Sequence, residues 1–375
     1  MMIKEIKAKS ILIKHKKIDS WFMTHYGMNL YRGCEHNCSY CDGRSERYNV
    51  DGDFGKEVIV KINAIELLKK ALDPSKKKKP LPKSFIMVGG GVCDTYQPAE
   101  KKYKLTRQSL KIIKDYGYPT HILTKSTLVK RDIDILSKIN KQNKVLISFS
   151  FSSLDDSLSK LFEPGVPSPS KRLDTIKRLK DKGFYCGMYL MPVIPFITDS
   201  AEMIEESIKK AKDAGVDFVM FATMTLKGGR QKEYFLKTLK KYYPKLLLDY
   251  GLIYKENNRW GEASRSYTYP VHEVFDNIAT LYKVPKRIPP YIYKDIISTD
   301  DLVIVILEHL DYLLKLKGKK NPYGYAAYNL SRLNRDIGDI GFKELQEIKG
   351  IGPVTAKIIK EILSTGTSRY YESIL

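Results

Sequence analysis

The chain of 375 residues contains no uninterrupted run of about 18 apolar residues, the least that a membrane-spanning helix needs. Its first residues, MMIKEIKAKS, lack the apolar centre of a secretion signal. Cysteine is scarce, with five residues in all. We therefore expect a cytoplasmic protein with no membrane partner, in a reducing compartment, and not a secreted protein held by disulfides.

Acidic residues are also fewer than basic residues. Lys and Arg together number 65 against 43 Asp and Glu, which gives a net charge of +22. A surface this basic suits a polyanion, and nucleic acid is the first candidate partner. A Lys-rich proteome would give the same surface without such a partner. Residues 293–375 hold 12 basic and 11 acidic residues, so the excess lies mainly before them.

Three of the five cysteines, Cys34, Cys38 and Cys41, follow the spacing C-x3-C-x2-C. Residues this close can all face one centre only if a loop wraps around it, and a metal or an iron–sulfur cluster is the usual centre. Structural zinc needs four ligands, and His36 lies inside the loop, where it cannot easily turn to the same metal. The spacing predicts a 4Fe–4S cluster whose three protein ligands leave one iron open.

Between residues 26 and 245, apolar segments typical of strands alternate with helical patterns. Strands are expected at 27–31, 85–88, 120–124, 145–151, 185–191 and 217–222, with a short strand at 10–13 in an N-terminal extension, 1–25. Helices are expected at 62–72, 99–116, 131–140, 170–182, 201–214 and 231–243. This order predicts an α/β fold with a parallel sheet, namely a partial (β/α)6 barrel. Chemistry in such barrels gathers at the C-terminal ends of the strands.

Several residues fall at those strand ends. Gly89, Gly90 and Gly91 follow the second strand, and glycines let a ligand approach the backbone. Lys125 follows the third strand, where it can pair with a carboxylate or simply face solvent. Ser148 and Ser150 lie on one face of the fourth strand because side chains alternate along a strand.

The C-terminal third divides into two parts. Residues 246–292 interleave aromatic and basic residues, a pattern that can stack bases but that we interpret as a cap on the open side of the barrel. Residues 293–375 are expected to form a small all-α domain with a helix at 302–316.

Within that domain, 342–366 resembles the helix–hairpin–helix motif of DNA-binding proteins. The glycines of the hairpin would approach the sugar-phosphate backbone, and amides at the start of the second helix would bind a phosphate. The residues assigned to this contact are Lys349, Gly350, Ile351, Gly352, Val354 and Lys357. The alternative is an ordinary helical hairpin used for packing.

The cysteine spacing, with the aromatic Tyr40 before the third cysteine, resembles the radical S-adenosylmethionine (SAM) superfamily. This resemblance implies that the open iron chelates SAM and that one electron from the cluster breaks its C–S bond. The resulting 5′-deoxyadenosyl radical would then abstract a hydrogen from the substrate. It also implies a reducing electron donor such as flavodoxin or ferredoxin. The resemblance assigns SAM contacts to Tyr40, Gly89–Gly91 and Lys125, and we assign Ser148 and Ser150 to the same site.

An ordered set of phrases narrows the resemblance to the spore photoproduct lyase-like, or DNA repair photolyase-like, branch. The phrases are CDTYQPAE (93–100), LTR (105–107), LTKS (123–126), RDID (131–134), EPG (163–165), PSP (167–169) and MP (191–192). In the lyase a cysteine returns a hydrogen to the product. Cys93 lies near the position of that donor, although the lyase pattern has further residues between its cysteine and the following motif. Its alternative role is a small loop thiol.

The sequence therefore predicts a radical SAM iron–sulfur enzyme that acts on DNA or RNA, by lesion repair or base modification. Two alternatives remain open. One is radical chemistry on a protein or a small molecule. The other is a DNA-binding protein whose cluster is structural or redox-sensing.

Overall fold

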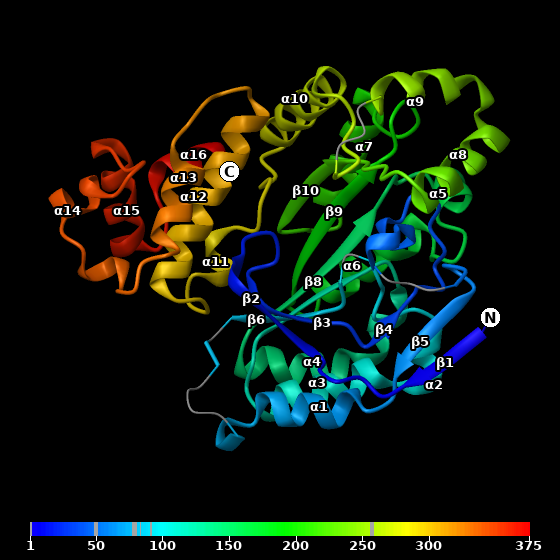
Figure 1. The fold of residues 1–375 in the computed structure, drawn as a ribbon, viewed down its shortest axis with the longest axis horizontal. Helices are drawn as coiled ribbons and strands as arrows, with labels where there is room; N and C mark the ends of the chain where they lie inside the picture. Colours follow the sequence, from blue (N-terminus) through cyan, green and yellow to red (C-terminus); the bar gives the residue numbers. More distant parts are fainter. Residues whose placement is uncertain (1, 49–51, 77–80, 83, 91, 256–258) are drawn as a thin grey trace.

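Seven strands form the main sheet of the computed structural model, which describes residues 2–48, 52–76, 81–82, 84–90, 92–255 and 259–375 (Figure 1). Their order across the sheet is β10-β9-β8-β7-β6-β3-β2. The strands are β2 (Leu12–Asp19), β3 (Thr24–Met28), β6 (Phe85–Val88), β7 (Thr120–Thr124), β8 (Val145–Phe151), β9 (Tyr185–Val193) and β10 (Phe218–Thr223). Six of them pair in parallel, and only β2 runs antiparallel, beside β3. This sheet confirms the predicted partial (β/α)6 barrel.

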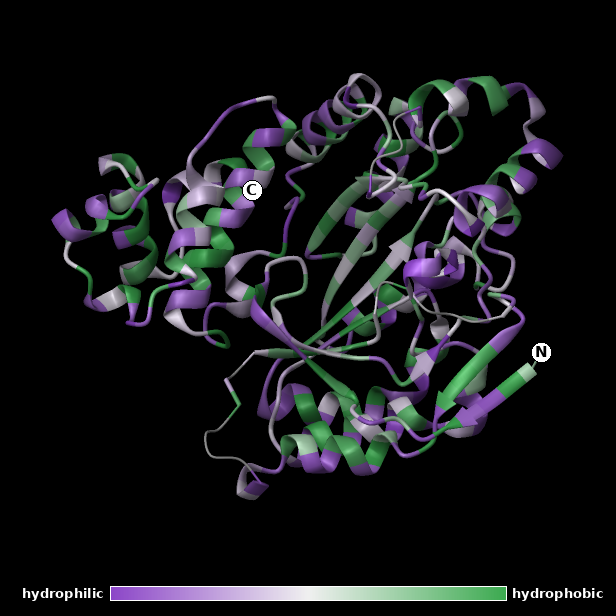
Figure 2. Cartoon of the chain, in the orientation of Figure 1, coloured by the Kyte–Doolittle hydropathy of each residue, from purple (hydrophilic) through white to green (hydrophobic). Residues whose placement is uncertain are grey.

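Eight of the described helices follow the strands. They are α1 (Ala64–Leu72), α2 (Ala99–Tyr103), α3 (Leu105–Asp115), α4 (Ile133–Gln142), α5 (Asp156–Phe162), α6 (Pro169–Lys180), α7 (Ala201–Asp213) and α8 (Arg230–Tyr242). Helices α5 and α8 pack beside the cysteine loop, whereas most of the others cover the outer face of the main sheet. Their apolar sides bury Leu110, Ile176 and Ile208 against strand residues such as Ile122 and Ile147 in one hydrophobic cluster. Figure 2 shows the resulting pattern, with hydrophobic strands at the centre and helices that alternate between hydrophobic and hydrophilic sides.

The structure departs from the prediction in three places. The first parallel strand ends at Met28 and not at residue 31. The single helix expected at 99–116 is divided into α2 and α3, because Lys104 adopts a left-handed φ of 52°. A second sheet, β1 (Met2–Ile6), β5 (Glu57–Lys61) and β4 (Tyr31–Arg32), was not predicted; it joins segments more than 50 residues apart and buries only short alternating stretches.

Eight helices of the C-terminal third are described. They are α9 (Leu247–Ile253), α10 (Arg265–Leu281), α11 (Pro290–Tyr293), α12 (Thr299–Leu316), α13 (Tyr323–Leu330), α14 (Phe342–Glu347), α15 (Pro353–Thr365) and α16 (Arg369–Ile374). Helix α10 packs on α7 and on the edge strand β10. It therefore covers part of the open side of the barrel, while α11 to α16 extend beyond it (Figure 1).

The C-terminal helices share a core with the inside of the barrel. Phe85 and Phe218 of the sheet belong to the same hydrophobic cluster as Val303 and Ile306 of α12. A polar contact reinforces this packing, since His309 Nε2 lies 2.8 Å from the carbonyl oxygen of Ser20. The barrel and these helices are thus held together by continuous apolar packing. In the described part of the chain, no helix combines the length and the apolar character that crossing a bilayer requires.

Candidate active site at the cysteine loop

The three closely spaced cysteines line one cavity at the C-terminal ends of the strands. Cys34 and Cys38 are 6% and 5% exposed, and Cys41 is half-buried. The strand ends and the loops after them contribute the opposite wall: Gly90, Val92, Cys93, Asp94, Leu123, Thr124, Lys125 and Ser150. The loop and the barrel rim therefore enclose a single site, in the place where barrels of this type carry their chemistry.

Arg44 holds the cysteine loop together from behind. Its guanidinium donates to the carbonyl oxygens of Cys38 at 3.0 Å, Asn37 at 3.2 Å and Phe54 at 3.2 Å. Asn37 itself adopts a left-handed φ of 55°, which bends the chain between the first two cysteines. Burial lowers the pKa of Arg44, but a guanidinium stays charged at any physiological pH. A buried cation thus gathers three carbonyl dipoles and fixes the shape of the loop.

Gly165 lets the cysteine loop lie directly against the segment after α5. Its amide donates to the carbonyl oxygen of His36 at 3.0 Å, and the amide of Ser39 donates to Phe162 O at 2.8 Å. A Cβ atom at position 165 would lie 2.5 Å from the carbonyl oxygen of Glu35. The EPG phrase therefore has a mechanical role, because no larger residue fits where the two backbones touch.

Glu163 is the centre of a buried polar network beside the cavity. It accepts hydrogen bonds from Lys125 Nζ at 2.9 Å and from Arg172 at 2.7 Å. Further donors to its carboxylate are the hydroxyls of Tyr40, Ser152 and Ser159. Burial alone would raise the pKa of Glu163, but the charges of Arg172 and Lys125 hold it well below its usual value. The carboxylate is therefore ionised, and it fixes the Lys125 side chain at the edge of the cavity.

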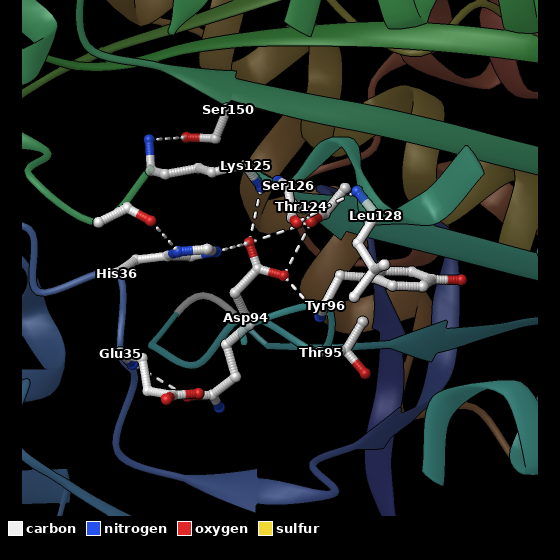
Figure 3. Close-up of polar contacts among 12 residues, drawn as sticks. Glu35, His36, Asp94, Thr95, Tyr96, Thr124, Lys125, Ser126, Leu128 and Ser150 are labelled. Atoms are coloured by element: carbon white, nitrogen blue, oxygen red, sulfur yellow. Dashed lines mark hydrogen bonds and ion pairs between the residues drawn. The ribbon is translucent and has the colours of Figure 1, made fainter. Parts of the chain in front are cut away.

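His36 and Asp94 form a second buried pair, which joins the cysteine loop to the strand ends (Figure 3). His36 Nε2 lies 3.1 Å from Asp94 Oδ2, and His36 Nδ1 lies 2.9 Å from the carbonyl oxygen of Gly165. Asp94 also accepts from Thr124 Oγ1 at 2.8 Å and from the amide of Lys125 at 2.7 Å. Burial would raise the pKa of Asp94, yet the bond to His36 and the backbone amides lower it overall. Both ring nitrogens of His36 thus face oxygen acceptors, and neither is available to a metal.

The donor set fits a cluster and not a single metal ion. Among the described residues, no three His, Cys, Asp or Glu side chains lie close enough together to hold one ion. A zinc site needs its sulfurs about 2.3 Å from the same ion. Cysteines of a four-iron cluster bind different irons, and so they need only share one cavity. Cys34, Cys38 and Cys41 meet that requirement.

The burial of the three thiols changes their pKa. Burial raises the pKa of Cys34, Cys38 and Cys41 above the ordinary value of a thiol. Without a cation they therefore stay protonated at neutral pH. A metal centre reverses this because it coordinates the thiolate and releases the proton. Burial raises the pKa of the core thiol of Cys186 as well, so the assignment of a cluster rests on the three loop thiols sharing one cavity.

Comparison with known proteins agrees with this geometry. Residues 28–205 match the Radical SAM superfamily. The protein Rv2578c of Mycobacterium tuberculosis is 30% identical over 234 residues, which cover 61% of this chain and 67% of that protein. The protein MJ0683 of Methanocaldococcus jannaschii is 33% identical over 214 residues, which cover 56% of this chain and 75% of that protein. The chain belongs to the radical SAM superfamily.

A solved radical SAM structure shares the fold. Spore photoproduct lyase, complexed with dinucleoside spore photoproduct, aligns with a TM-score of 0.54 over 75% of this chain and 79% of the lyase chain. The sequence identity is 15%, so the likeness concerns the fold. It extends beyond the matched superfamily region, which ends at residue 205.

Some of the residues predicted to contact SAM line the cysteine cavity, and others do not. Gly90 and Lys125 line the cavity, as does Ser150, whose Oγ lies 3.0 Å from Lys125 Nζ. Gly89 adopts a φ of 100° directly after β6, and Gly91 lies outside the described residues. These assignments stay predictions, with a geometry that favours Gly90, Lys125 and Ser150.

Two predicted contacts lie further from the cavity. Ser148 is on the same face of β8 as Ser150 but is fully buried, and its hydroxyl lies 2.9 Å from His121 Nε2. The side chain of Tyr40 is buried with Cys38 and Phe162, and its hydroxyl donates to Glu163. Both hydroxyls are therefore already engaged within the protein, and their contact with SAM stays a prediction.

Cys93 lies in the wall of the cavity together with the three cysteines of the loop. Its Sγ is 3.2 Å from the carbonyl oxygen of Gly33 and accepts from Gln97 Nε2 at 3.4 Å. This position is compatible with the predicted hydrogen donor, whose role remains a prediction. Cys186, in contrast, is buried in the hydrophobic core of the barrel, as expected from its place in the fifth parallel strand.

The predicted hairpin consists of α14, the loop at 348–352 and α15, and the two helices are in contact. Gly350 has a φ of 90°, and Gly352 immediately precedes α15, with Pro353 at its first position. Ile351 is buried and anchors the loop. Lys349, Val354 and Lys357 are exposed, so the tip of the hairpin faces solvent. Two helices joined by a short loop occupy the predicted residues, while the helix–hairpin–helix assignment and its contact with nucleic acid stay predictions.

Sequence reasoning missed the polar side chains that support the site. Glu163 was noted only as part of the EPG phrase, and His36 only as a rejected zinc ligand. Arg44 and Arg172 carried no signal at all, because their partners are fixed by the fold. Asp94 could have been found, since a carboxylate within CDTYQPAE at a strand end is an unusual core residue.

Proposed function

We propose that this protein is a radical SAM enzyme that cleaves SAM at a 4Fe–4S cluster and acts on nucleic acid, as a DNA-repair or base-modifying enzyme. The cleavage of SAM at a cluster is supported by one observation: three cysteines, two of them buried and one half-buried, line one cavity at the barrel rim. Cys34, Cys38 and Cys41 would hold the cluster. When bound, the cluster and SAM supply one-electron chemistry and a radical that abstracts hydrogen.

The residues of the chain would orient SAM in this cavity. Gly90 offers backbone close to the ligand, and Lys125 offers a cation for its carboxylate. Because Glu163 already holds the ammonium of Lys125, an arriving carboxylate finds a lysine that is charged and fixed in place.

Three observations support nucleic acid as the substrate. The net charge of the chain is +22, and its excess lies outside residues 293–375. The hairpin presents Lys349, Gly352 and Lys357 to solvent at the start of a helix. The structural likeness to a lyase complexed with a dinucleoside lesion adds an analogy of fold.

The first test is SAM cleavage by the anaerobically reconstituted and reduced protein, with dithionite or a flavodoxin or ferredoxin as donor. We expect 5′-deoxyadenosine and methionine from the natural chain and from a C186A variant, whose cysteine lies outside the cavity. A variant with Cys34, Cys38 and Cys41 all changed to alanine should bind no iron and form no 5′-deoxyadenosine. Equal behaviour of the triple variant and the natural chain would refute the enzyme.

The second test concerns the substrate. Affinity for duplex DNA should fall steeply as salt rises, because phosphate contacts release counterions. Product analysis by mass spectrometry after anaerobic reaction with UV-irradiated DNA then reports whether a lesion is consumed. SAM cleavage without nucleic-acid binding would instead indicate a protein or small-molecule substrate. Nucleic-acid binding without iron-dependent SAM cleavage would indicate a DNA-binding protein with a structural or redox-sensing cluster.

A further inference from the structure

A second cavity, of about 630 Å³, opens beside the edge strand β10. Its walls come from the end of β10, from α10, from α12 and from Trp21 in the turn between β2 and β3. Among the described residues it shares no lining side chain with the cysteine cavity. Its volume is in the range of small-molecule sites, about 300–1,000 Å³. The C-terminal helices thus create a pocket that the barrel alone would not have.

His272 of α10 is the most unusual residue in the wall of this cavity. It is only 8% exposed, and its Nδ1 is buried without a hydrogen-bond partner among the described residues. Leaving such a group unsatisfied destabilises the fold, so native proteins rarely do so. Burial, and then the charge of Arg287, lowers the pKa of His272 to about 4. The ring is therefore neutral at pH 7. Its Nδ1 has no accessible surface, so only Nε2 is left to meet a ligand in the cavity.

Aromatic rings and a cation complete the wall. Trp21 and Tyr312 meet edge to face, with ring centroids 5.5 Å apart, and Tyr269 is 40% exposed. Arg265 also lines the cavity, and within the described residues it makes no ion pair. Lys315, by contrast, is paired with Asp311. Arg287 packs over the rings of Trp21 and Tyr312, with its guanidinium carbon 4.1 Å and 3.6 Å from their centroids, and Glu262 adds a carboxylate to the wall. The site thus offers aromatic side chains, a buried neutral imidazole, one carboxylate and one guanidinium that makes no ion pair among the described residues.

We propose that this cavity binds a nucleotide, with the base against the aromatic wall, Nε2 of His272 on a polar edge of the base and Arg265 on the phosphate. Base stacking on aromatic rings together with a cation for the phosphate is the chemistry of single-strand recognition. An inorganic anion would leave the aromatic wall unused, and an apolar ligand would leave His272 and Arg265 without partners. The same chemistry serves a free mononucleotide or a nucleotide displaced from a strand. In the second case the inference rests on the proposed function.

The cavity is connected to the cysteine loop. Thr225, in its wall, donates from Oγ1 to Asp42 Oδ1 at 2.9 Å, and Asp42 follows Cys41 directly. Lys227 joins the same carboxylate. Thr225 therefore links the wall of this cavity to the residue that follows the third cysteine of the loop.

The test uses the intrinsic fluorescence of Trp21. The chain has two tryptophans, so a W260F background leaves Trp21 as the sole reporter. The reconstituted protein, saturated with SAM to fill that site, is titrated with mononucleotides in one arm and with a short single-stranded DNA or RNA in the other. We expect saturable quenching of Trp21 in at least one arm. Binding should be about tenfold weaker in R265Q and in H272F, because each removes a hydrogen bond of about 1.4 kcal/mol or more.

A matched control is R178Q, which removes an exposed arginine of α6 outside the cavity. Absence of quenching in both arms, or equal weakening in R178Q and R265Q, would overturn the proposal. Should H272F not fold, R265Q still decides, because Arg265 is exposed. If Trp21 shows no quenching while SAM cleavage and duplex binding are intact, only the proposal for this cavity is refuted. Mononucleotide binding without any affinity for DNA or RNA strands refutes the nucleic-acid substrate and keeps the site.

Discussion

The ammonium of Lys125 lies 2.9 Å from a carboxylate oxygen of Glu163, at the boundary between the cysteine cavity and the buried network behind it. The same carboxylate pairs with Arg172, and neither Glu163 nor Arg172 has exposed side-chain surface. A lysine assigned to a ligand is therefore oriented by a residue 38 positions later in the chain.

Replacing Glu163 with glutamine should destabilise the protein strongly. Removing one partner of a buried pair typically costs about 3–5 kcal/mol, because the charges of Arg172 and Lys125 remain unbalanced. Urea unfolding at pH 7 measures this loss. E206Q serves as the control, since Glu206 is exposed and pairs with Lys210 on the surface of α7. A loss in E163Q no larger than in E206Q would contradict the role given to the network.

The effect of Glu163 should also depend on pH. Its pKa is lowered from 4.5 in the folded protein, so its contribution is fully present above that value and is lost as pH falls through the folded pKa. The difference in unfolding free energy between the natural chain and E163Q should therefore be constant near neutrality and shrink below about pH 4.5. Urea titrations at several pH values, done on protein without cluster, measure this difference. A gap that widens in acid would show the opposite linkage.

Replacing Gly165 with alanine should disturb the cysteine loop. The added Cβ would lie 2.5 Å from Glu35 O and 2.9 Å from His36 Cα, and overpacking of this kind costs about 1–3 kcal/mol. We expect a lower melting temperature and less iron bound per chain after reconstitution. The control is G251A in α9, where nothing lies within 4 Å of the new Cβ. That change should be neutral or stabilise by about 0.5–1 kcal/mol, and full iron loading of G165A would contradict the close-contact argument.

If Cys93 returns a hydrogen to the substrate, the C93A variant should separate two activities. SAM cleavage should persist, because Cys93 is not one of the three cluster ligands. The product formed from UV-irradiated DNA should change, which mass spectrometry detects. C186A provides the control, since Cys186 is an equally buried thiol in the barrel core. Identical products from C93A and C186A would leave Cys93 with only a packing role.

The hairpin lysines should act through charge alone. Lys349 and Lys357 are exposed, and substitution by glutamine should weaken duplex binding without changing sequence preference. Each lysine that contacts a phosphate should lower the slope of log K against log salt by about 1. K319Q is the comparison, because Lys319 is equally exposed and lies before the hairpin. An unchanged slope in the K349Q/K357Q double variant would remove the hairpin from the interface.

Local sequence patterns predicted most of the fold. The strands at Phe85–Val88, Thr120–Thr124 and Val145–Phe151 have the predicted bounds, because strands buried on both faces read as short apolar runs. The pairing of β1 with β5 could not be predicted, since their register depends on segments more than 50 residues apart. The break at Lys104 was also hidden, because lysine gives no warning of a left-handed conformation.

The site, like the fold, combines local features that the sequence predicts with long-range contacts that it does not. The cysteine spacing is local and could be interpreted directly, whereas the partners of the predicted ligands could not. His121 lies 27 positions before Ser148 and occupies its hydroxyl, and Asp94 lies 58 positions after His36. Which polar groups meet inside a barrel is decided by the register of neighbouring strands, and a single sequence does not reveal it.

Because α12 packs into the base of the barrel, it also fixes the distance between the hairpin and the cysteine cavity. The hairpin is packed onto α12, since Ile351, Ala356 and Ile359 belong to the same hydrophobic cluster. Figure 1 shows α14 and α15 beyond α12, on the side away from the sheet. If the hairpin and the cysteine cavity both bind one strand, as proposed, oligonucleotides shorter than the distance between them would contact only one of the two.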